Sequence, residues 1–587
     1  MAIERRIAPT SLRLVLVALA GLLIALLGWW PMIAQYPHTP ELDGQYSFYQ
    51  FEIGKAIISR YHEFPLWNPY DCRGIPHWDF PESMGASPLL LLGFWLPPLI
   101  QYYLWNILHC AAGFVGMWLL VRDDLKLSRI ASFAAATGWA LGAAHTAQYS
   151  TGHVMMAGFW NFPLLLFLWR RAENSIGSAI GVGILLSWMI YDGGTYPVPF
   201  CVLLLVLEAA TRLTSLARLK SIVVAGVVTG ATGILLAAPR LLPISKQFSG
   251  HVRPNPYPDV DSITNMANVR SMFLMRQTQW SLHLPGQQYV WNEYISYLGI
   301  AGLLIALVGM CIAAVRRRWL VVLTLMVFVL MLGHFASWAP WHVLQTRVFP
   351  FTSMRVSSRF RFFMTAFAAM FVAIAIDELP PIVGRFAGPS RGKIARVAVV
   401  GLAFLSAGDV MAFGYEMLTA RFGWAPPVTV EASPRFYYGG PGLTPVFTDQ
   451  PRQNRAWTGC RAVSWAFYEN APVWTGDVPQ VRASDANATV GNVRRTPNRF
   501  TFETDVNAPT ARIRVNSAYG DGWRTDVGTV VNDGDLLAVD VPQGHHVVHL
   551  RYWPNYLTLG LWMAFVGVVG IAAYAFRGKL FRAKSKA

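Results

Sequence analysis

Residues 41–70 of the chain read ELDGQYSFYQFEIGKAIISRYHEFPLWNPY and follow closely on an apolar run from Leu14 to Ile33. Asp43 is followed by apolar and aromatic residues at helical spacing: Tyr46, Tyr49, Ile53, Ile57 and Tyr61. This spacing predicts an amphipathic helix lying in a membrane interface. At the start of such a helix Asp43 is expected to cap backbone amides, a role compatible with presenting a carboxylate just outside the membrane.

The composition defines the class of protein. The chain has 587 residues, of which 54% are hydrophobic and 14% charged, and its mean hydropathy is +0.36. This is too apolar for an ordinary soluble enzyme and predicts a polytopic α-helical membrane protein. The net charge of +16 would suggest nucleic acid in a soluble protein. Here the basic residues cluster in short loops between apolar runs, so we expect contacts with membrane lipids and no nucleic-acid partner.

Apolar runs of roughly 17 to 25 residues mark the expected spans. They predict about twelve transmembrane helices, several of them short, near residues 14–34, 101–121, 130–146, 155–169, 176–192, 197–211, 221–239, 294–315, 319–334, 361–379, 395–416 and 556–576. Alternate connections are rich in Arg and Lys, which by the positive-inside rule places them and both termini in the cytoplasm. The first run ends in GWWPMIAQYP without a small-residue cleavage site, so we expect it to be retained as an anchor.

The long loops between spans, including 35–100, are then extracytoplasmic. Residues 417–555 differ from the rest because they combine Pro and Gly punctuation with period-two alternation, as in FTFETDV and LLAVDVP. We therefore expect a transmembrane domain over 1–416, a β-sandwich-like extracytoplasmic domain over 417–555, and a final helix with a basic cytoplasmic tail over 556–587. Cys72 and Cys460 both fall on the outer side, where a disulfide between them can persist.

Several stretches together resemble one family of proteins. They are DGQYSFYQF (43–51), PLWNPY (65–70) with Gly-Ile-Pro at 74–76, then 102–132, 138–169, WNEYISYLGIAGLLIAL (291–307), FPFTSMRVSSRFRFF (349–363) and the terminal 517–554. In order and spacing these resemble the YfhO family of multi-span bacterial membrane proteins with the GT-C glycosyltransferase fold. The chain departs from the family at YDGGTYP (191–197), where relatives often have Gly-His.

The resemblance implies transfer of a sugar from a polyprenyl-phosphate carrier to an extracytoplasmic glycan, lipid or polymer acceptor in the bacterial inner membrane. Asp43 matches the family's early acidic residue, which serves as general base or helps hold a divalent metal. It also implies inversion at the sugar carbon if a single displacement operates. A Mg or Mn ion would then involve Asp43 and Glu41, although no dense Asp-x-Asp motif is present.

The chemistry of the transfer points to further residues. A leaving phosphate needs cations, and Arg355 and Arg359, four apart at the start of a span, are expected to form a clamp, with Arg240 as a secondary donor-binding candidate. Expected substrate-lining residues are His153, Asp192, Glu293 and Tyr294. His77 and Asp79 in PHWDFPE either line the site and bind a cation or form a hydrogen-bonded loop core.

Two other classes of function stay open. A lipid or polysaccharide transporter or flippase would have a similar number of spans, but it usually carries polar groups at mid-membrane in paired repeats. A non-catalytic envelope protein would use its β domain to bind glycan. The ionisable residues of this chain lie mainly in the outer loops, which favours the enzyme.

Overall fold

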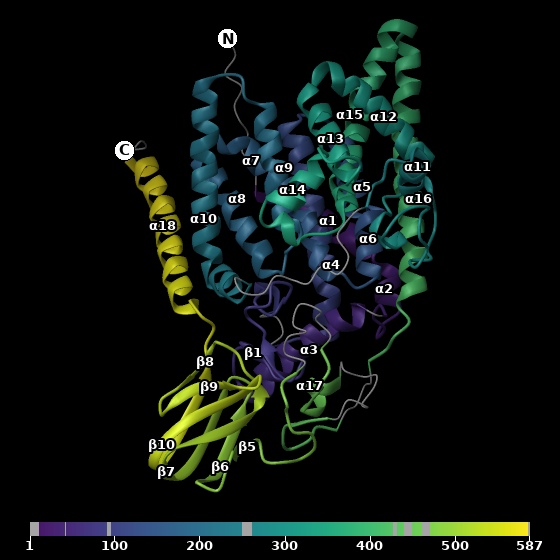
Figure 1. Cartoon of the computed structure of the whole chain (residues 1–587). Coiled ribbons are helices and arrows are strands. Elements are labelled where there is room, and N and C mark those ends of the chain that lie inside the picture. The colour runs from purple at the N-terminus through teal and green to yellow at the C-terminus, as the bar shows by residue number, and fades with distance from the viewer. Residues whose placement is uncertain are drawn as a thin grey trace.

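The computed structural model describes residues 11–41, 43–90, 95–248, 261–426, 431–439, 449–460 and 470–584, with only the backbone of Ser11, Phe248 and 577–584. The described part of the chain forms a helical bundle, an interface helix and a sheet module (Figure 1). The bundle helices are α1 (Ser11–Gly28), α2 (Trp30–Ala34), α4 (Pro98–Leu119), α5 (Arg129–Ala140), α6 (Ala143–Ser150), α7 (Phe162–Ala172), α8 (Ile176–Tyr191), α9 (Pro197–Thr211), α10 (Leu216–Phe248), α11 (Met266–Leu274), α12 (Gly299–Arg316), α13 (Arg318–Met331), α14 (Pro340–Arg347), α15 (Arg361–Ala387), α16 (Pro389–Arg421) and α18 (Leu557–Lys584).

The protein is a multi-pass membrane protein, although the expected twelve spans are not confirmed. Among the described residues, six helices are long and apolar enough to cross a membrane: Pro98–Asp124, Leu216–Gln247, Gly299–Arg316, Ser357–Ala387, Pro389–Arg421 and Leu557–Phe576. Four shorter apolar helices accompany them: Leu12–Gly28, Ile176–Tyr191, Pro197–Thr211 and Arg318–Met331. The predicted span 130–146 breaks between α5 and α6, and the predicted span 155–169 begins with a 3-10 helix, η3 (Val154–Asn161).

Ion pairs join the helices at the end of the bundle that lies away from the sheet. Arg170 contacts Asp124 and Glu208, both at 2.6 Å, and Arg316 contacts Glu378 at 2.9 Å. Glu208 is fully buried, so it depends on the arginine for compensation of its charge. These pairs involve the same basic loops that the positive-inside rule assigned to one side of the membrane.

The described part of the sheet module is a hydrogen-bonded antiparallel sheet of six strands. Its strands are β5 (Val481–Ala483), β6 (Ala488–Thr496), β7 (Arg499–Ala518), β8 (Trp523–Thr525), β9 (Thr529–Asp533) and β10 (Leu536–Tyr552). The order is β5-β7-β10-β8, with β6 also on β7 and β9 also on β10. Helix α16 extends to Arg421, past the expected boundary at 417.

An irregularity between Pro542 and Gly544 divides the long β7–β10 ladder into two halves. Across it the buried residues of β7 change from even to odd numbers: Phe500, Phe502 and Val506, then Ala511, Ile513 and Val515. Because side chains alternate along a strand, this shift lets both halves turn apolar side chains into a single core.

The first loop belongs to the same core as the sheet. Helix α3 (Asp43–Tyr61) lies between bundle and sheet, followed by the short strands β1 (Trp67–Asn68) and β2 (Ile75–Pro76) (Figure 1). Trp67 lies 5.4 Å from Trp523 and 4.7 Å from Tyr552, measured between ring centroids. Cys72 and Cys460 form a disulfide, as the sequence allowed. The segment that precedes the sheet contains a second pair of short strands and one short helix. The strands are β3 (Tyr437–Tyr438) and β4 (Arg455–Ala456), and the helix is α17 (Gln450–Gln453).

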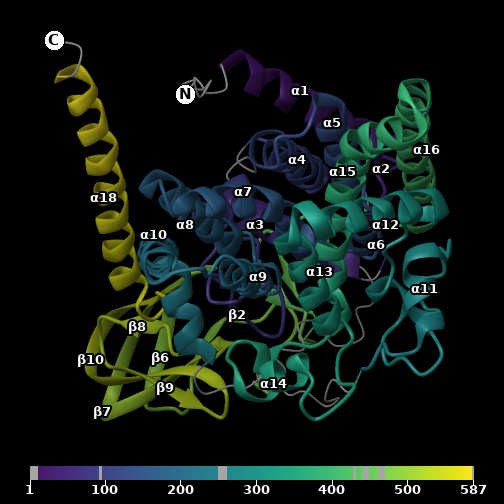
Figure 2. The ribbon, with the colours of Figure 1, turned by 90° about the horizontal axis from the view of Figure 1, so that it is seen from above.

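Helix α18 returns from the sheet to the bundle and packs along α10 at the periphery (Figure 2). At this contact a Cβ on Gly560 would lie 2.6 Å from the carbonyl oxygen of Ala238. The glycine therefore permits the close approach of the two helices. The sheet is thus attached to the bundle on two sides, by α18 and by the first loop.

The disulfide should stabilise the attachment of the sheet to the first loop. Replacing Cys72 and Cys460 together by Ser is expected to lower the free energy of unfolding of the sheet module by about 2 to 4 kcal/mol, because the unfolded chain gains conformational freedom. The measurement is protease resistance of the module in rising urea. Cys311→Ser on α12 is the control, and equal resistance of all variants would contradict the prediction.

Candidate functional site

Asp43 is the first residue of α3, and its carboxylate faces a histidine from another part of the chain. Asp43 Oδ2 lies 3.0 Å from His153 Nε2, and the Asp43 side chain is 65% exposed. Ser47 Oγ donates to the carbonyl oxygen of Gly152 at 2.6 Å, which joins α3 to the loop that carries His153. Gly152 has φ +93°, and a Cβ there would lie 1.9 Å from the amide nitrogen of Gly44. Only glycine permits this approach.

A hydrogen-bonded chain leads from His153 into the protein interior. His153 Nδ1 lies 2.5 Å from Gln148 Oε1, and Gln148 Nε2 donates to Glu293 Oε2 at 2.9 Å. Gln148 Nε2 also faces the carbonyl oxygen of Asn292 at 3.2 Å, which orients the amide with its oxygen toward His153. Both nitrogens of the His153 ring therefore face acceptor oxygens, which fixes the orientation of the ring.

Glu293 is the buried end of this chain, held by arginines of the segment that opens α15. Its carboxylate accepts two hydrogen bonds from Arg359, from Nε at 3.1 Å and from Nη2 at 2.6 Å. Burial raises the pKa of the Glu293 carboxyl, but Arg359 outweighs that effect and lowers the pKa to about 2. The Arg359 guanidinium also lies 4.0 Å from the centre of the Tyr196 ring. Glu293 is thus a stable carboxylate.

Arg361 supports Glu293 from a fully buried position. It donates to the backbone carbonyl oxygens of Ile295 at 3.0 Å, Glu293 at 2.5 Å and Asn292 at 2.9 Å. Three carbonyls from one loop orient the guanidinium and fix the 3-10 turn η4 (Trp291–Glu293). Arg361 therefore positions Glu293 through the backbone.

The predicted helical clamp of Arg355 and Arg359 is not formed. Helix α15 begins only at Arg361, after a 3-10 turn, η6 (Ser357–Phe360), and Val356 between the two arginines has φ +70°. The two side chains therefore do not share a helix face. Arg355 is part-exposed and has no hydrogen bond or ion pair with the residues that the structure describes, and its buried Nε has no partner there either.

Other expected site residues hold the first loop in place. Arg240 is fully buried and donates to the carbonyl oxygens of Trp78 (2.5 Å), Phe80 (2.7 Å) and Ser83 (2.5 Å), which argues against the expected contact with a donor phosphate. Asp79 accepts from Tyr552 of β10 at 3.2 Å.

Burial raises the pKa of the Asp79 carboxyl to about 7, although Tyr552 and Arg240 lower it in part. Burial, together with Arg240, lowers the pKa of His77 to about 3. Both side chains are buried, so the hydrogen-bonded loop core, one of the two readings of PHWDFPE, describes them better than a cation site.

Asp192 and Tyr294 also lie apart from Asp43. Asp192 pairs with His109 of α4 at 3.1 Å and accepts from Ser87 Oγ at 2.5 Å. Tyr294 is buried, and its hydroxyl donates to Asp261 Oδ2 at 2.8 Å. Each has its own partners, and neither belongs to the hydrogen-bonded chain that leads from Asp43 to Arg359.

The described side chains do not build a metal cage. Among them, no group of three or more His, Cys, Asp or Glu is placed to hold an ion. Asp43 faces His153, whereas Glu41 lies toward Gly423 on the segment after α16. A Mg²⁺ ion would need ligands from substrate phosphates in addition.

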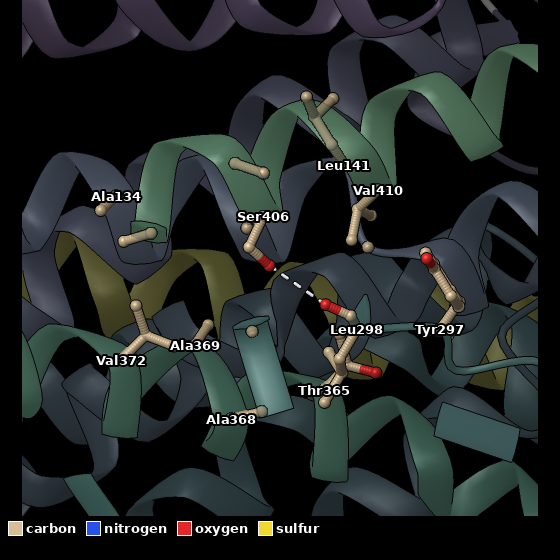
Figure 3. A pocket seen from close by; sticks show the side chains of 15 residues that line it. Ala134, Leu141, Tyr297, Leu298, Thr365, Ala368, Ala369, Val372, Ser406 and Val410 are labelled. Atoms are coloured by element: carbon tan, nitrogen blue, oxygen red, sulfur yellow. Dashed lines mark hydrogen bonds between the residues drawn. The ribbon is translucent and has the colours of Figure 1, made fainter. Parts of the chain in front are cut away.

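An apolar pocket lies next to the buried end of the site (Figure 3). It is lined by α5, α12, α15 and α16 and includes Tyr297, Leu298 and Thr365. Thr365 Oγ1 donates to the carbonyl oxygen of Arg361 at 3.1 Å, and Leu298 follows the loop that Arg361 holds. The pocket therefore begins about one helical turn from the Glu293 arginines.

The residues that sequence reasoning missed are Gln148, Gly152 and Arg361. Gln148 lies five residues before His153 in HTAQYSTGHV, and Arg361 lies two residues after Arg359. Nothing in this run singles out Gln148, because His145, Thr146, Ser150 and Thr151 around it are polar as well. Arginine in the first turn of an apolar span was the signal for Arg361.

No protein-family model and no curated protein matches the chain, so membership of the YfhO family is not confirmed. Similar solved structures include the arabinofuranosyltransferase AftD from Mycobacteria, at 16% identity and a TM-score of 0.43 over 78% of this chain. The chain spans about a third of the length of AftD, 32%. Another is ArnT from Cupriavidus metallidurans bound to undecaprenyl phosphate, at 13% identity and a TM-score of 0.42, covering 78% of this chain and 87% of ArnT.

The buried pair of Glu293 and Arg359 should be essential for stability. Glu293→Gln is expected to lower the free energy of unfolding by about 3 to 5 kcal/mol, because it leaves arginine charge buried without a counterion. The matched control is Glu416→Gln, because Glu416 pairs with Arg276 on an exposed surface. This change should lower the free energy of unfolding by less than about 1 kcal/mol. Thermal unfolding of both variants in the same detergent measures the difference, and similar losses would contradict the prediction.

Proposed function

We propose that the protein is a membrane glycosyltransferase that moves a sugar from a polyprenyl-phosphate carrier to an extracytoplasmic glycan, lipid or polymer acceptor. The observation that carries the proposal is the exposed carboxylate of Asp43, which His153 orients at the outer end of a buried polar chain. Asp43 also lies in the stretch that resembles the opening loop of GT-C glycosyltransferases. A carboxylate that is both oriented and accessible is what a general base requires.

In the proposed reaction Asp43 accepts the proton of the acceptor hydroxyl. The hydroxyl oxygen forms a bond to the anomeric carbon while the bond from that carbon to the phosphate oxygen breaks, so polyprenyl phosphate leaves with the electron pair. A single displacement of this kind inverts the anomeric configuration. His153 keeps the carboxylate aligned, and the absence of a Cβ at Gly152 permits that alignment.

The leaving phosphate needs a cation that is not already neutralised. Arg359 is committed to Glu293 by two hydrogen bonds, whereas Arg355 has no ion pair with a described residue. We therefore assign the phosphate to Arg355 and the positioning of Glu293 to Arg359 and Arg361. This replaces the symmetrical clamp expected from the spacing of the two arginines.

The lipid chain of the carrier needs an apolar path beside this phosphate. The pocket in Figure 3 offers small and apolar side chains from α12, α15 and α16 and begins near Arg361. We place the first isoprene units there. The end of the bundle that carries α3 and the sheet is then extracytoplasmic, and the basic loops at the other end are cytoplasmic.

Asp43→Asn should abolish transfer while leaving the fold intact. Because the amide cannot accept the proton, the rate of sugar transfer is expected to fall by about 10²- to 10⁴-fold. The assay uses purified full-length protein, a panel of polyprenyl-phosphate sugars and envelope acceptors. Asp505→Asn is the matched control, because Asp505 forms an exposed pair with His545 on the sheet, at 2.7 Å and 62% exposure. Full activity of Asp43→Asn would move the base elsewhere.

Arg355→Gln tests the assignment of the phosphate. Loss of a cation that interacts more strongly with the leaving group than with bound donor should lower kcat by about 10²-fold. Arg347→Gln, an exposed arginine at the end of α14, is expected to stay within about twofold of the wild type. An unchanged kcat for Arg355→Gln would exclude Arg355 as the phosphate ligand.

A further inference from the structure

A second pocket lies farther along α3 than Asp43. It is lined by Glu52, Lys55 and Arg60 of α3 and by Arg452 of α17, and its apolar wall includes Leu99. Glu52 follows Asp43 by nine residues, which is about 13 Å along a helix. The pocket is therefore separate from the proposed catalytic site, although the same helix builds both.

Glu52 is a buried acid without a direct partner. The residue is 6% exposed, and its carboxylate forms no hydrogen bond or ion pair with another residue in the described ranges. Lys55 and Arg452 act on it electrostatically from a distance. Burial raises the pKa of the Glu52 carboxyl to about 7, so its charge is poorly compensated as the protein stands. A buried acceptor of this kind gains free energy when a ligand supplies a donor.

The other charged residues that line the pocket are basic. Arg60 donates to the backbone carbonyl oxygens of Pro451 and Arg452, both at 2.8 Å, which fixes α17 against α3. Arg452 lies 3.5 Å from Asp449. The region thus holds three positive charges and two carboxylates. The cations are Lys55, Arg60 and Arg452, and the carboxylates are those of Glu52 and Asp449. This arrangement suits a ligand with a phosphate and, beside it, a cationic donor for Glu52.

The pocket also lies at the level where apolar spans end. Pro98 begins a candidate span, and Pro97, Pro98 and Leu99 line the pocket. Tyr36 and Pro37, just beyond α2, line it as well. Residues at the ends of spans lie among lipid headgroups, where tyrosine is enriched.

We propose that this pocket binds the headgroup of a phospholipid of the ethanolamine class, with the ammonium group at Glu52 and the phosphate facing Lys55 and Arg452. The lipid's acyl chains then extend past Leu99 into the bilayer. The headgroup supplies the hydrogen-bond donor that Glu52 lacks among the described residues and an anion for the basic wall. This site does not depend on the glycosyltransferase assignment.

Native mass spectrometry of the delipidated full-length protein tests the proposal. The protein is mixed with equal amounts of phosphatidylethanolamine, phosphatidylcholine and phosphatidylglycerol of the same acyl composition. We expect about tenfold greater retention of phosphatidylethanolamine than of the other two lipids, because a choline group has no N–H to donate and a glycerol group has no charge. Glu52→Gln should remove this preference, while Lys55→Gln should weaken retention of all three lipids.

Lys393→Gln, an exposed change at the start of α16, is the control and should retain lipids as the wild type does. Equal retention of the three lipids by the wild type, or an unchanged preference in Glu52→Gln, would overturn the proposal. Soluble glycerophosphoethanolamine provides a further arm: competition as strong as that of the lipid would assign the pocket to a soluble ligand. If Glu52→Gln does not fold, unchanged retention by Lys55→Gln would overturn the proposal in its place.

Discussion

The candidate site depends on one buried carboxylate, that of Glu293. In the low-dielectric interior this charge is tolerated only because Arg359 binds both of its oxygens and Arg361 fixes the turn that carries it. The same carboxylate orients Gln148, and Gln148 orients the ring of His153. The direction of the Asp43 carboxylate is therefore set by contacts that reach from the first loop to the start of α15.

A second constraint is that the first loop is bonded both to the helical bundle and to the sheet module. Arg240 of α10 holds the loop's backbone from the bundle side, and Trp67 and Cys72 join it to the sheet and the segment before the sheet. The loop thus contributes to the cores of two bodies, which keeps α3 at a fixed place between them. A residue proposed as general base, such as Asp43, needs this kind of support if it is to meet its substrate in one geometry.

Much of this arrangement could be predicted from the sequence in pieces, but the connections between the pieces could not. Hydropathy indicates a membrane protein, and period-two alternation indicates the strands near the C-terminus, because both signals are local. Asp43, His153, Glu293 and Arg359 were each expected at a site. Their joining through Gln148 depends on contacts between residues more than 100 positions apart, for which a single sequence carries no periodic signal. Arg355 and Arg359 do not share a helix face as predicted, because Val356 between them takes a left-handed conformation that the sequence of the motif does not reveal.

Arg355, Arg359 and Arg361 differ in whether other groups of the protein already neutralise or surround their charge. Glu293 neutralises Arg359, and backbone carbonyls surround Arg361, so neither has charge to spare for a substrate phosphate. Both nitrogens of the His153 ring face oxygens, one of Gln148 and one of Asp43, so the ring is held between them. Arg355 alone of the three arginines has no carboxylate or carbonyl partner in the described part of the chain. Of the three, Arg355 is therefore the arginine whose charge the described residues leave available for the phosphate of the proposed reaction.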